Sequence, residues 1–150
     1  MRYLLFASIV LFTIGCNDDK EAVAPDLAIE GQIFELVNDH RTASGLPTLE
    51  RNTACDREAS SHSGDMATGN VEFGHDGWEG RFERITEETG SSAFGENVAF
   101  GQEDATSVMN SWLDSSPHKA NIEGDFSHIG IGVAEAENGQ LYFTQVFVKI

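Results

Sequence analysis

The segment Ser60-Ser61-His62-Ser63-Gly64-Asp65-Met66 begins a stretch, ending at His118, that holds three of the chain's five histidines. The second lies in Phe73-Gly74-His75-Asp76-Gly77 and the third closes Trp112-Leu113-Asp114-Ser115-Ser116-Pro117-His118. Between them comes Gly95-Glu96-Asn97-Val98. Imidazole and carboxylate together suit metal ligation or proton transfer near neutral pH. This stretch is therefore the candidate site, and the rest of the chain is interpreted as its scaffold.

Helical spacing of apolar residues predicts two long helices in the first half of the chain. The first begins after Asp26, which can cap it, and ends near Gly45. The second begins around Asn52-Thr53, with Asp56 in its first turn. The apolar face of the second helix consists of Cys55, Ala59 and Met66.

His62 lies on that same face, three residues after Ala59 and four before Met66. Two interpretations of His62 stay open: a half-buried histidine hydrogen-bonded within the core, or a residue that lines a cleft. Cys55, on the apolar face itself, is interpreted as a buried small hydrophobic residue rather than a nucleophile.

The middle of the chain predicts loops, a short strand and further helix. Glycines at 64, 69, 74, 77 and 80 place His75 on irregular backbone, and short helical character returns around 81–85. A short strand from Phe94 to Phe100 includes Glu96. Asp104 can cap a third long helix, which ends where Ser115-Ser116-Pro117 starts a new turn. Its inward face is formed by Ala105, Val108, Met109 and Trp112.

The C-terminus carries the clearest β pattern, since apolar residues alternate over 129–133 and again over 142–148. Glu137-Asn138-Gly139-Gln140 lies between these runs, and Asn-Gly favours a type I′ hairpin. Helices come first and an antiparallel hairpin last, with little β-α-β alternation. This order predicts a layered α+β domain.

Residues 1–16 resemble the signal peptide of a bacterial lipoprotein. Arg2 precedes an apolar run over 3–14 that is too short to span a bilayer, and Thr13-Ile14-Gly15-Cys16 resembles a lipobox. The resemblance implies that Cys16 is lipidated and becomes the mature N-terminus; an ordinary secretory signal is the alternative. Residues 17–25 are then an acidic tether and 26–150 the domain, placed outside the cytoplasm on the outer membrane or the cell surface.

Charge restricts the partners. Removing residues 1–16 removes one base and no acids, so 8 Lys+Arg face 25 Asp+Glu, a formal charge of −17. Nucleic acid and anionic lipid headgroups would be repelled, which leaves membrane contact to the N-terminal lipid alone. If Cys16 carries lipid, only Cys55 remains, and no disulfide within the chain can form.

The ordered set of motifs resembles the CAP superfamily, also known as the SCP-like extracellular domain, in its bacterial branch. The matching pieces, from about residue 29 to 150, are Leu36-Val37-Asn38-Asp39-His40-Arg41, Gly45-Leu46-Pro47-Thr48-Leu49, His62-Ser63-Gly64-Asp65-Met66, Phe73-Gly74-His75, Gly95-Glu96-Asn97-Val98, Ser116-Pro117-His118-Lys119-Ala120-Asn121-Ile122, Ile129-Gly130-Ile131-Gly132-Val133 and Thr144-Gln145-Val146-Phe147. The resemblance implies a three-layer α-β-α sandwich.

The family also implies a surface cleft lined by two histidines and two acidic residues. By position these are His75, Glu96 and His118, with Asp114 as a shorter substitute at the fourth place. Independently of the family, two imidazoles, a carboxylate and water could form an open zinc site of modest affinity. The same groups could instead form a hydrogen-bonded network around a binding groove.

Two classes of function follow from that cleft. The favoured interpretation is an exported binding domain for a small apolar ligand, a cell-wall fragment or a protein, with a weakly bound divalent metal such as zinc. The alternative is a metal-dependent hydrolase of peptidase type that uses His75, Glu96 and His118. The chain has no His-Glu-x-x-His pattern and no serine or cysteine in the local sequence of an activated nucleophile, so no catalytic residue is assigned.

Overall fold

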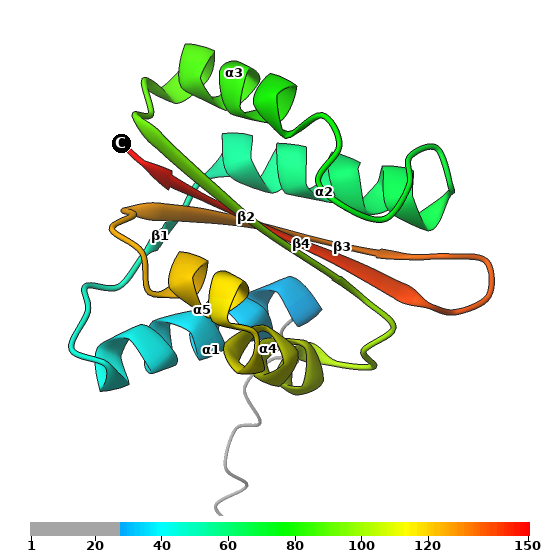
Figure 1. Cartoon of the computed structure of the whole chain (residues 1–150), viewed down its shortest axis with the longest axis horizontal. Helices are drawn as coiled ribbons and strands as arrows, with labels where there is room; N and C mark the ends of the chain where they lie inside the picture. The colour runs from blue at the N-terminus through cyan, green and yellow to red at the C-terminus, as the bar shows by residue number, and fades with distance from the viewer. Residues whose placement is uncertain (1–27) are drawn as a thin grey trace, which may run out of the picture.

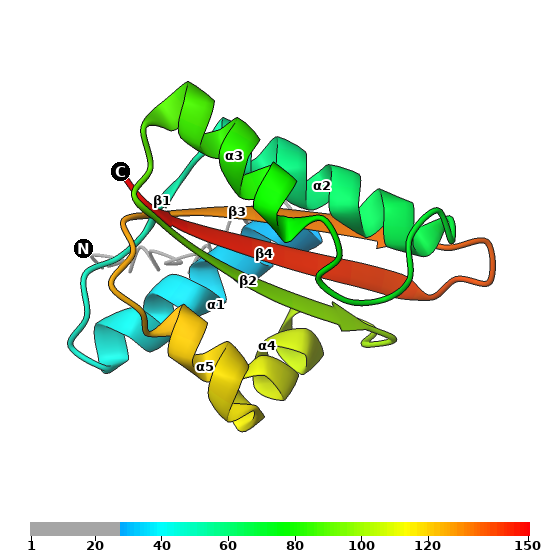
Figure 2. The same cartoon turned by 45° about the horizontal axis from the view of Figure 1, so that its top comes forward.

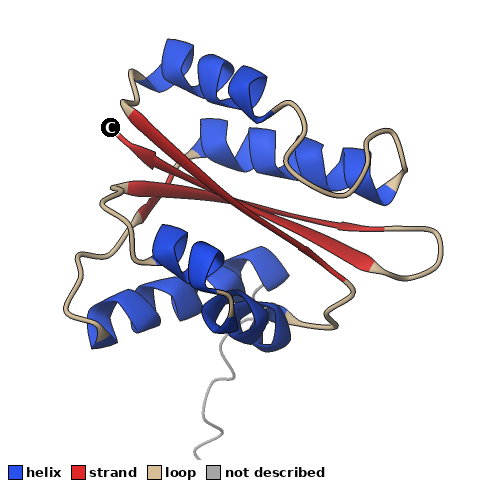
Figure 3. Ribbon diagram, in the orientation of Figure 1, coloured by secondary structure: helices blue, strands red, loops and turns tan. Residues whose placement is uncertain are grey.

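A computed structural model describes residues 28–150 and arranges them in three layers, with a sheet between two layers of helices (Figure 1). Figure 3 shows the same sandwich by secondary structure. The predicted α-β-α architecture is therefore confirmed. The predicted signal peptide with Cys16, the tether over 17–25 and the Asp26 cap lie outside the described residues. No helix of the described part is long and apolar enough to cross a membrane.

The sheet has four strands in the order β1-β3-β4-β2, so β2 (Ala93–Phe100) lies at one edge. The short β1 (Glu50–Arg51) runs parallel to β3 (His128–Glu135) at the other edge. In the middle, β3 and β4 (Leu141–Lys149) form the predicted antiparallel hairpin. Strand β2 pairs antiparallel with β4 along its whole length, from Ala93 to Phe100.

The turn of that hairpin differs from the sequence prediction. A type I′ turn needs positive φ at both central residues, but among the described residues only glycines have positive φ. The amide of Gly139 donates to the carbonyl of Ala136, and Gly139 itself has φ 82°. This is a type I turn followed by a left-handed glycine, so the type I′ prediction is wrong.

One face of the sheet carries α1 (Ile29–Ala43), α4 (Ala105–Asp114) and α5 (Ser116–Ile122). The α4 start is the predicted one, because the Asp104 carboxylate accepts from the Ser107 amide and completes a capping box. Trp112 is 1% exposed, which confirms the inward stripe of this helix. The buried cluster here includes Ile33, Val37, Val108, Met109, Trp112, Ile129, Ile131, Phe143 and Phe147.

The opposite face carries α2 (Thr53–Ala67) and α3 (Trp78–Thr89). Asn52 caps α2 by accepting from the amides of the next helical turn. Cys55 is fully buried, as predicted, and burial raises the pKa of its thiol to about 12, so the thiol stays protonated and unreactive. The smaller buried cluster on this face consists of Cys55, Ala59, Ile85, Val146 and Val148.

Both helical layers reach the free edge of β2, as the second view shows (Figure 2). From one layer, Asn121 of α5 donates to the Glu96 carbonyl, and the Trp112 indole of α4 donates to the Val98 carbonyl. From the other layer, Arg81 of α3 reaches the Glu96 side chain. The two layers therefore meet at Glu96, and this strand edge is where the candidate site forms.

Candidate functional site

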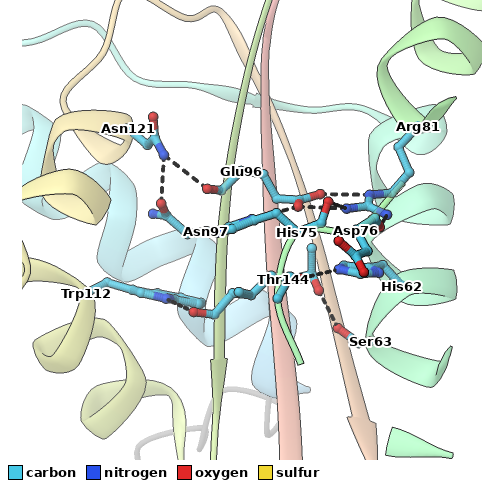
Figure 4. A network of polar contacts seen from close by, with 12 residues as sticks. His62, Ser63, His75, Asp76, Arg81, Glu96, Asn97, Trp112, Asn121 and Thr144 are labelled. Carbon is cyan, nitrogen blue, oxygen red and sulfur yellow. Dashed lines mark hydrogen bonds and ion pairs between the residues drawn. The ribbon is translucent and has the colours of Figure 1, made fainter. Parts of the chain in front are cut away.

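Glu96 holds the site together through its carboxylate, which is 4% exposed (Figure 4). Arg81 binds it with two hydrogen bonds, Nε to Oε2 at 2.8 Å and one terminal nitrogen to Oε1 at 2.7 Å. The Nδ1 atom of His75 lies 2.9 Å from the same Oε1. Since an ionised carboxylate only accepts hydrogen bonds, His75 donates through Nδ1 and its Nε2 is left for a ligand. The imidazole itself is 48% exposed.

The loop that carries His75 is tied down at its backbone. Arg81 donates to the carbonyls of His75 and Asp76, and the Nε2 atom of His62 lies 2.8 Å from the Gly74 carbonyl. His62 must donate there, because a carbonyl can only accept. With an exposure of 3%, His62 is a core histidine that positions the loop. It also lines a separate hollow of ≈ 300 Å³, together with Asp76 and Arg81.

His118 reaches the same edge of the sheet from the other layer, held through a network of amide side chains. Asn97 donates to the His118 carbonyl and to the side-chain oxygen of Gln145. Asn121 donates to the Asn97 side chain as well as to the Glu96 carbonyl. The His118 imidazole is half-buried and makes no hydrogen bond to any other described residue. Burial, and secondly the charge of His75, lower the pKa of His118.

A hollow of ≈ 360 Å³ opens beside His75, within the usual size range of small-molecule sites. Its wall joins polar and aromatic groups: His75, Trp78, Phe94, Gly95 and Glu96. A Cβ atom at Gly95 would lie 2.9 Å from the ring of Phe126 and 3.0 Å from the Asn121 side chain, so a larger residue here would displace one or both side chains. The hollow thus sets the exposed imidazole against an aromatic surface.

The donor set for a metal is smaller than the sequence suggested. Within residues 28–150, no group of three or more His, Cys, Asp or Glu side chains is placed to hold a metal ion. Both oxygens of Glu96 are engaged by Arg81 and His75, so Glu96 supports His75 instead of lying free as a ligand. Asp114 is exposed at the end of α4, and in the described structure no hydrogen bond or ion pair joins it to His75, Glu96 or His118.

Arg81 is the residue of the site that sequence reasoning missed. It lay within a short predicted helix with no role assigned, yet it is 5% exposed and is the main partner of Glu96. One signal was available: Arg81 precedes the buried Ile85 by four residues, so both lie on the inward face of α3. A charged residue on a buried face needs a charged or hydrogen-bonded partner.

We expect His62 to make the protein less stable in mild acid. Burial, the largest cause, lowers the pKa of His62 in the folded state. The unfolded chain therefore takes up a proton first, and the free energy of unfolding falls as the pH drops below about 6.5. Urea unfolding between pH 8 and 5 should show this fall, and His62→Gln should reduce it. An equal fall in wild type and in His62→Gln would contradict the assignment.

Known proteins that are similar to this chain share this architecture. Residues 34–147 match the family described as CAP: Cysteine-rich secretory protein family. The chain is 34% identical over 124 residues to the uncharacterized membrane protein YlbC of Bacillus subtilis (strain 168), in a match that covers 80% of this chain and 34% of that protein. It spans about half or less of the length of the curated relatives it matches.

Solved structures share the fold. An extracellular protein containing a SCP domain from Bacillus anthracis str. Ames superposes with a TM-score of 0.71 at 29% identity, over 81% of this chain and 40% of that chain. An outer surface protein from Borrelia burgdorferi also gives a TM-score of 0.71, over 82% of this chain and 96% of that chain. At 20% sequence identity, this likeness supports a shared fold and nothing about function.

The family match runs from within α1 into β4 and so includes both helical layers and the site between them. The sequence motifs that resemble this family lie within the matched region. His75 precedes α3, Glu96 lies on β2 and His118 lies on α5. The chain therefore belongs to the CAP family of cysteine-rich secretory proteins.

Proposed function

We propose that this protein is an exported binding domain whose cleft at the edge of β2 holds a small ligand or a segment of a partner. One observation carries the proposal: a buried Arg81–Glu96 pair fixes the half-exposed imidazole of His75 beside an aromatic hollow. A buried ion pair is weak support for stability, because its desolvation offsets much of its attraction. Its use here is to hold one imidazole in one orientation.

The composition of the hollow indicates what it would bind. Trp78 and Phe94 offer an aromatic surface, with ring centroids 6.0 Å apart, and Trp78 is 41% exposed. Beside that surface the Nε2 atom of His75, whose ring proton is on Nδ1, can accept a hydrogen bond from a polar group of the ligand. A small apolar ligand with one hydrogen-bonding group, a cell-wall fragment or a protein segment would each match this pairing.

A divalent metal is a further ligand that the two imidazoles could hold. His75 would bind through Nε2 while Glu96 holds Nδ1, the arrangement that orients histidine ligands in metal sites. With His118 this makes two protein ligands, one fewer than catalytic zinc sites use. The metal would supply Lewis acidity, yet the residues present are better suited to weak binding than to a resident catalytic ion.

Zinc titration tests this pair of imidazoles. The purified protein should carry Cys16→Ser, so that the one remaining thiol is the buried Cys55. With two ligands instead of four, calorimetry should give about half of the roughly 10–16 kcal/mol of a structural zinc site. His75→Ala and His118→Ala should each remove most of the binding, whereas His128→Ala should not. Binding should also weaken as the solution is acidified, because neutral imidazole is the ligating form.

Two outcomes would change the interpretation of the cleft. Equal zinc binding by wild type, His75→Ala and His118→Ala, or none at millimolar zinc, would contradict the metal site. Turnover of a peptide substrate that disappears on chelation, and on replacing His75, Glu96 or His118, would support the metal-dependent hydrolase instead.

We expect the mature protein to be lipid-anchored at Cys16. The support is Thr13-Ile14-Gly15-Cys16 at the end of an apolar run, together with relatives named as membrane and extracellular proteins. In an expressing bacterium the protein should partition with membranes, and Cys16→Ser should release it from them. Mass spectrometry that finds an unmodified mature N-terminus at another residue would contradict the anchor and leave an ordinary secretory signal.

A further inference from the structure

A second hollow, of ≈ 440 Å³, lies on the outward side of α3 and combines aromatic and acidic side chains. It is lined by Trp78, Glu79, Phe82, Glu83, Thr86 and Glu87, all of which belong to α3. We propose that this groove, named here the α3 groove, binds small organic cations that carry an apolar body.

The aromatic part of the α3 groove is built by packing across two elements. Phe94 of β2 lies under the helix, 6.0 Å from the Trp78 ring and 5.3 Å from the Phe82 ring, measured between centroids. This support keeps Trp78 in place although the side chain is 41% exposed.

The acidic part of the groove is a row of like charges. Glu79, Glu83 and Glu87 recur every four residues, a spacing at which carboxylates on a helix repel one another. Within the described structure, no hydrogen bond or ion pair involves any of these three side chains. Arg84 attracts Glu83 at longer range but is bound to the buried Glu58. The row is therefore negative without a paired base.

Other carboxylates of the layer formed by α2 and α3 are paired with arginines. Glu88, also on α3, is bound at 2.8 Å by Arg57 of α2, and Glu58 is bound by Arg84. Among the acids of α3, those beside the aromatic rings are the ones left unpaired. A bound cation would relieve the repulsion and lie against the negative faces of the rings, so two attractions favour it together.

This combination selects ligands by charge sign. An anion of the same shape would be repelled by the row, and a neutral molecule would gain only the aromatic contact. The proposal does not depend on the His75 cleft, which shares Trp78 with the α3 groove but takes its polar groups from His75 and Glu96. Loss of one site can thus be told apart from loss of the other.

Three ligands of nearly equal shape test the proposal on the full chain: benzyltrimethylammonium, benzyl alcohol and phenylacetate. Trp112 is 1% exposed, so the exposed Trp78 is the tryptophan whose fluorescence should respond. The cation should give a saturable change with a dissociation constant in the millimolar range, at least about fivefold tighter than the alcohol. Phenylacetate should bind more weakly than either.

Charge-matched variants locate the site. Glu79→Gln/Glu83→Gln/Glu87→Gln should weaken cation binding about tenfold while leaving the alcohol unchanged. The control Glu103→Gln/Glu135→Gln/Glu137→Gln removes the same charge near the β3–β4 hairpin, at the opposite end of β2 from Phe94. It should bind the cation as wild type does. His75→Ala should also retain cation binding, whereas Trp78→Ala, followed by calorimetry, should lose it.

Folding does not obscure these results, because replacing the acidic row removes repulsion and should not lower the unfolding midpoint in urea. Equal affinity for all three ligands, or equal weakening in the α3 triple variant and its control, would overturn the proposal. The absence of saturable binding up to about 50 mM cation, roughly tenfold above the expected range, would overturn it as well.

Discussion

Glu96→Ala should lower the free energy of unfolding by about 3–5 kcal/mol, the loss expected when one partner of a buried ion pair is removed. Arg81 is only 6% exposed in its side chain, and Glu96 accepts two of its hydrogen bonds. Without Glu96, the guanidinium stays charged and loses the carboxylate that binds it at that depth. The large effect thus comes from the charge left behind.

A second buried glutamate provides a matched control for this variant. Glu58 is 7% exposed in its side chain and binds Arg84, but the Arg84 side chain is 56% exposed. After Glu58→Ala the arginine can turn into water, so the loss should be about 1 kcal/mol, as for surface pairs. Urea denaturation of both variants measures the difference. Equal losses would mean that burial of the arginine is not the cause.

The same change should also disturb the site. His75 donates to Glu96 through Nδ1, and Arg81 holds the backbone of the His75 loop. Glu96→Ala removes the hydrogen bond to His75 and also the carboxylate that holds Arg81 in place. Zinc affinity at His75 should therefore fall further than the loss of one nearby negative charge would explain. Glu96→Gln can still accept one of the hydrogen bonds and should retain part of that affinity. If Glu96→Ala leaves zinc binding intact, Glu96 does not position the imidazole.

Gly132→Ala should be more damaging still, with a loss of about 4 kcal/mol or more, enough to leave little folded protein. A Cβ atom at Gly132 would overlap the backbone of Ala59 and Ser60 in α2, and one at Gly130 would overlap Cys55 and Asp56. The helix and the strand approach so closely only because these two positions lack side chains. Neither backbone can move without breaking hydrogen bonds of the helix or the sheet.

Gly64→Ala is the matched control for that prediction, because Gly64 lies in α2 itself and a Cβ atom there would meet nothing within 4 Å. Alanine in place of glycine inside a helix should stabilise the protein by about 0.5–1 kcal/mol. Thermal or urea unfolding should therefore move in opposite directions for the two variants. Similar stability of Gly132→Ala and wild type would show that α2 packs less closely on β3 than described.

Local patterns in the sequence predicted most of the scaffold. Period-2 alternation marked β3 and β4, helical spacing marked α2 and α4, and the caps at Asn52 and Asp104 lie where polar residues precede those helices. These features depend on residues within one or two turns of one another, so a single sequence carries them. The prediction of the hairpin turn type was wrong, because the local sequence Asn-Gly is compatible with more than one turn type.

The site was predicted residue by residue, but not as a set of contacts. His75, Glu96 and His118 were predicted to share a cleft, with Glu96 either in an open zinc site or in a hydrogen-bonded network. In the structure Glu96 is hydrogen-bonded to Arg81 and His75, and no hydrogen bond or ion pair joins Asp114 to them in the described part of the chain. A carboxylate in a short strand has the same local sequence whether it binds a cation, a metal or a hydroxyl group. Only the neighbour brought by another element distinguishes these cases.

By itself, then, the sequence determined the acidic charge, the α+β order and the residues of the family motifs, because each is written in a contiguous segment or in the composition. Tertiary structure alone decided that α3 lies over the edge strand, that Arg81 neutralises Glu96, and that His62 supports the Gly74 loop from the core. It also brought the acidic row of α3 beside Phe94 and Trp78. The physical reason is that the energies of burial and of charge pairing depend on which segments of the chain come into contact. A local sequence pattern does not contain that information.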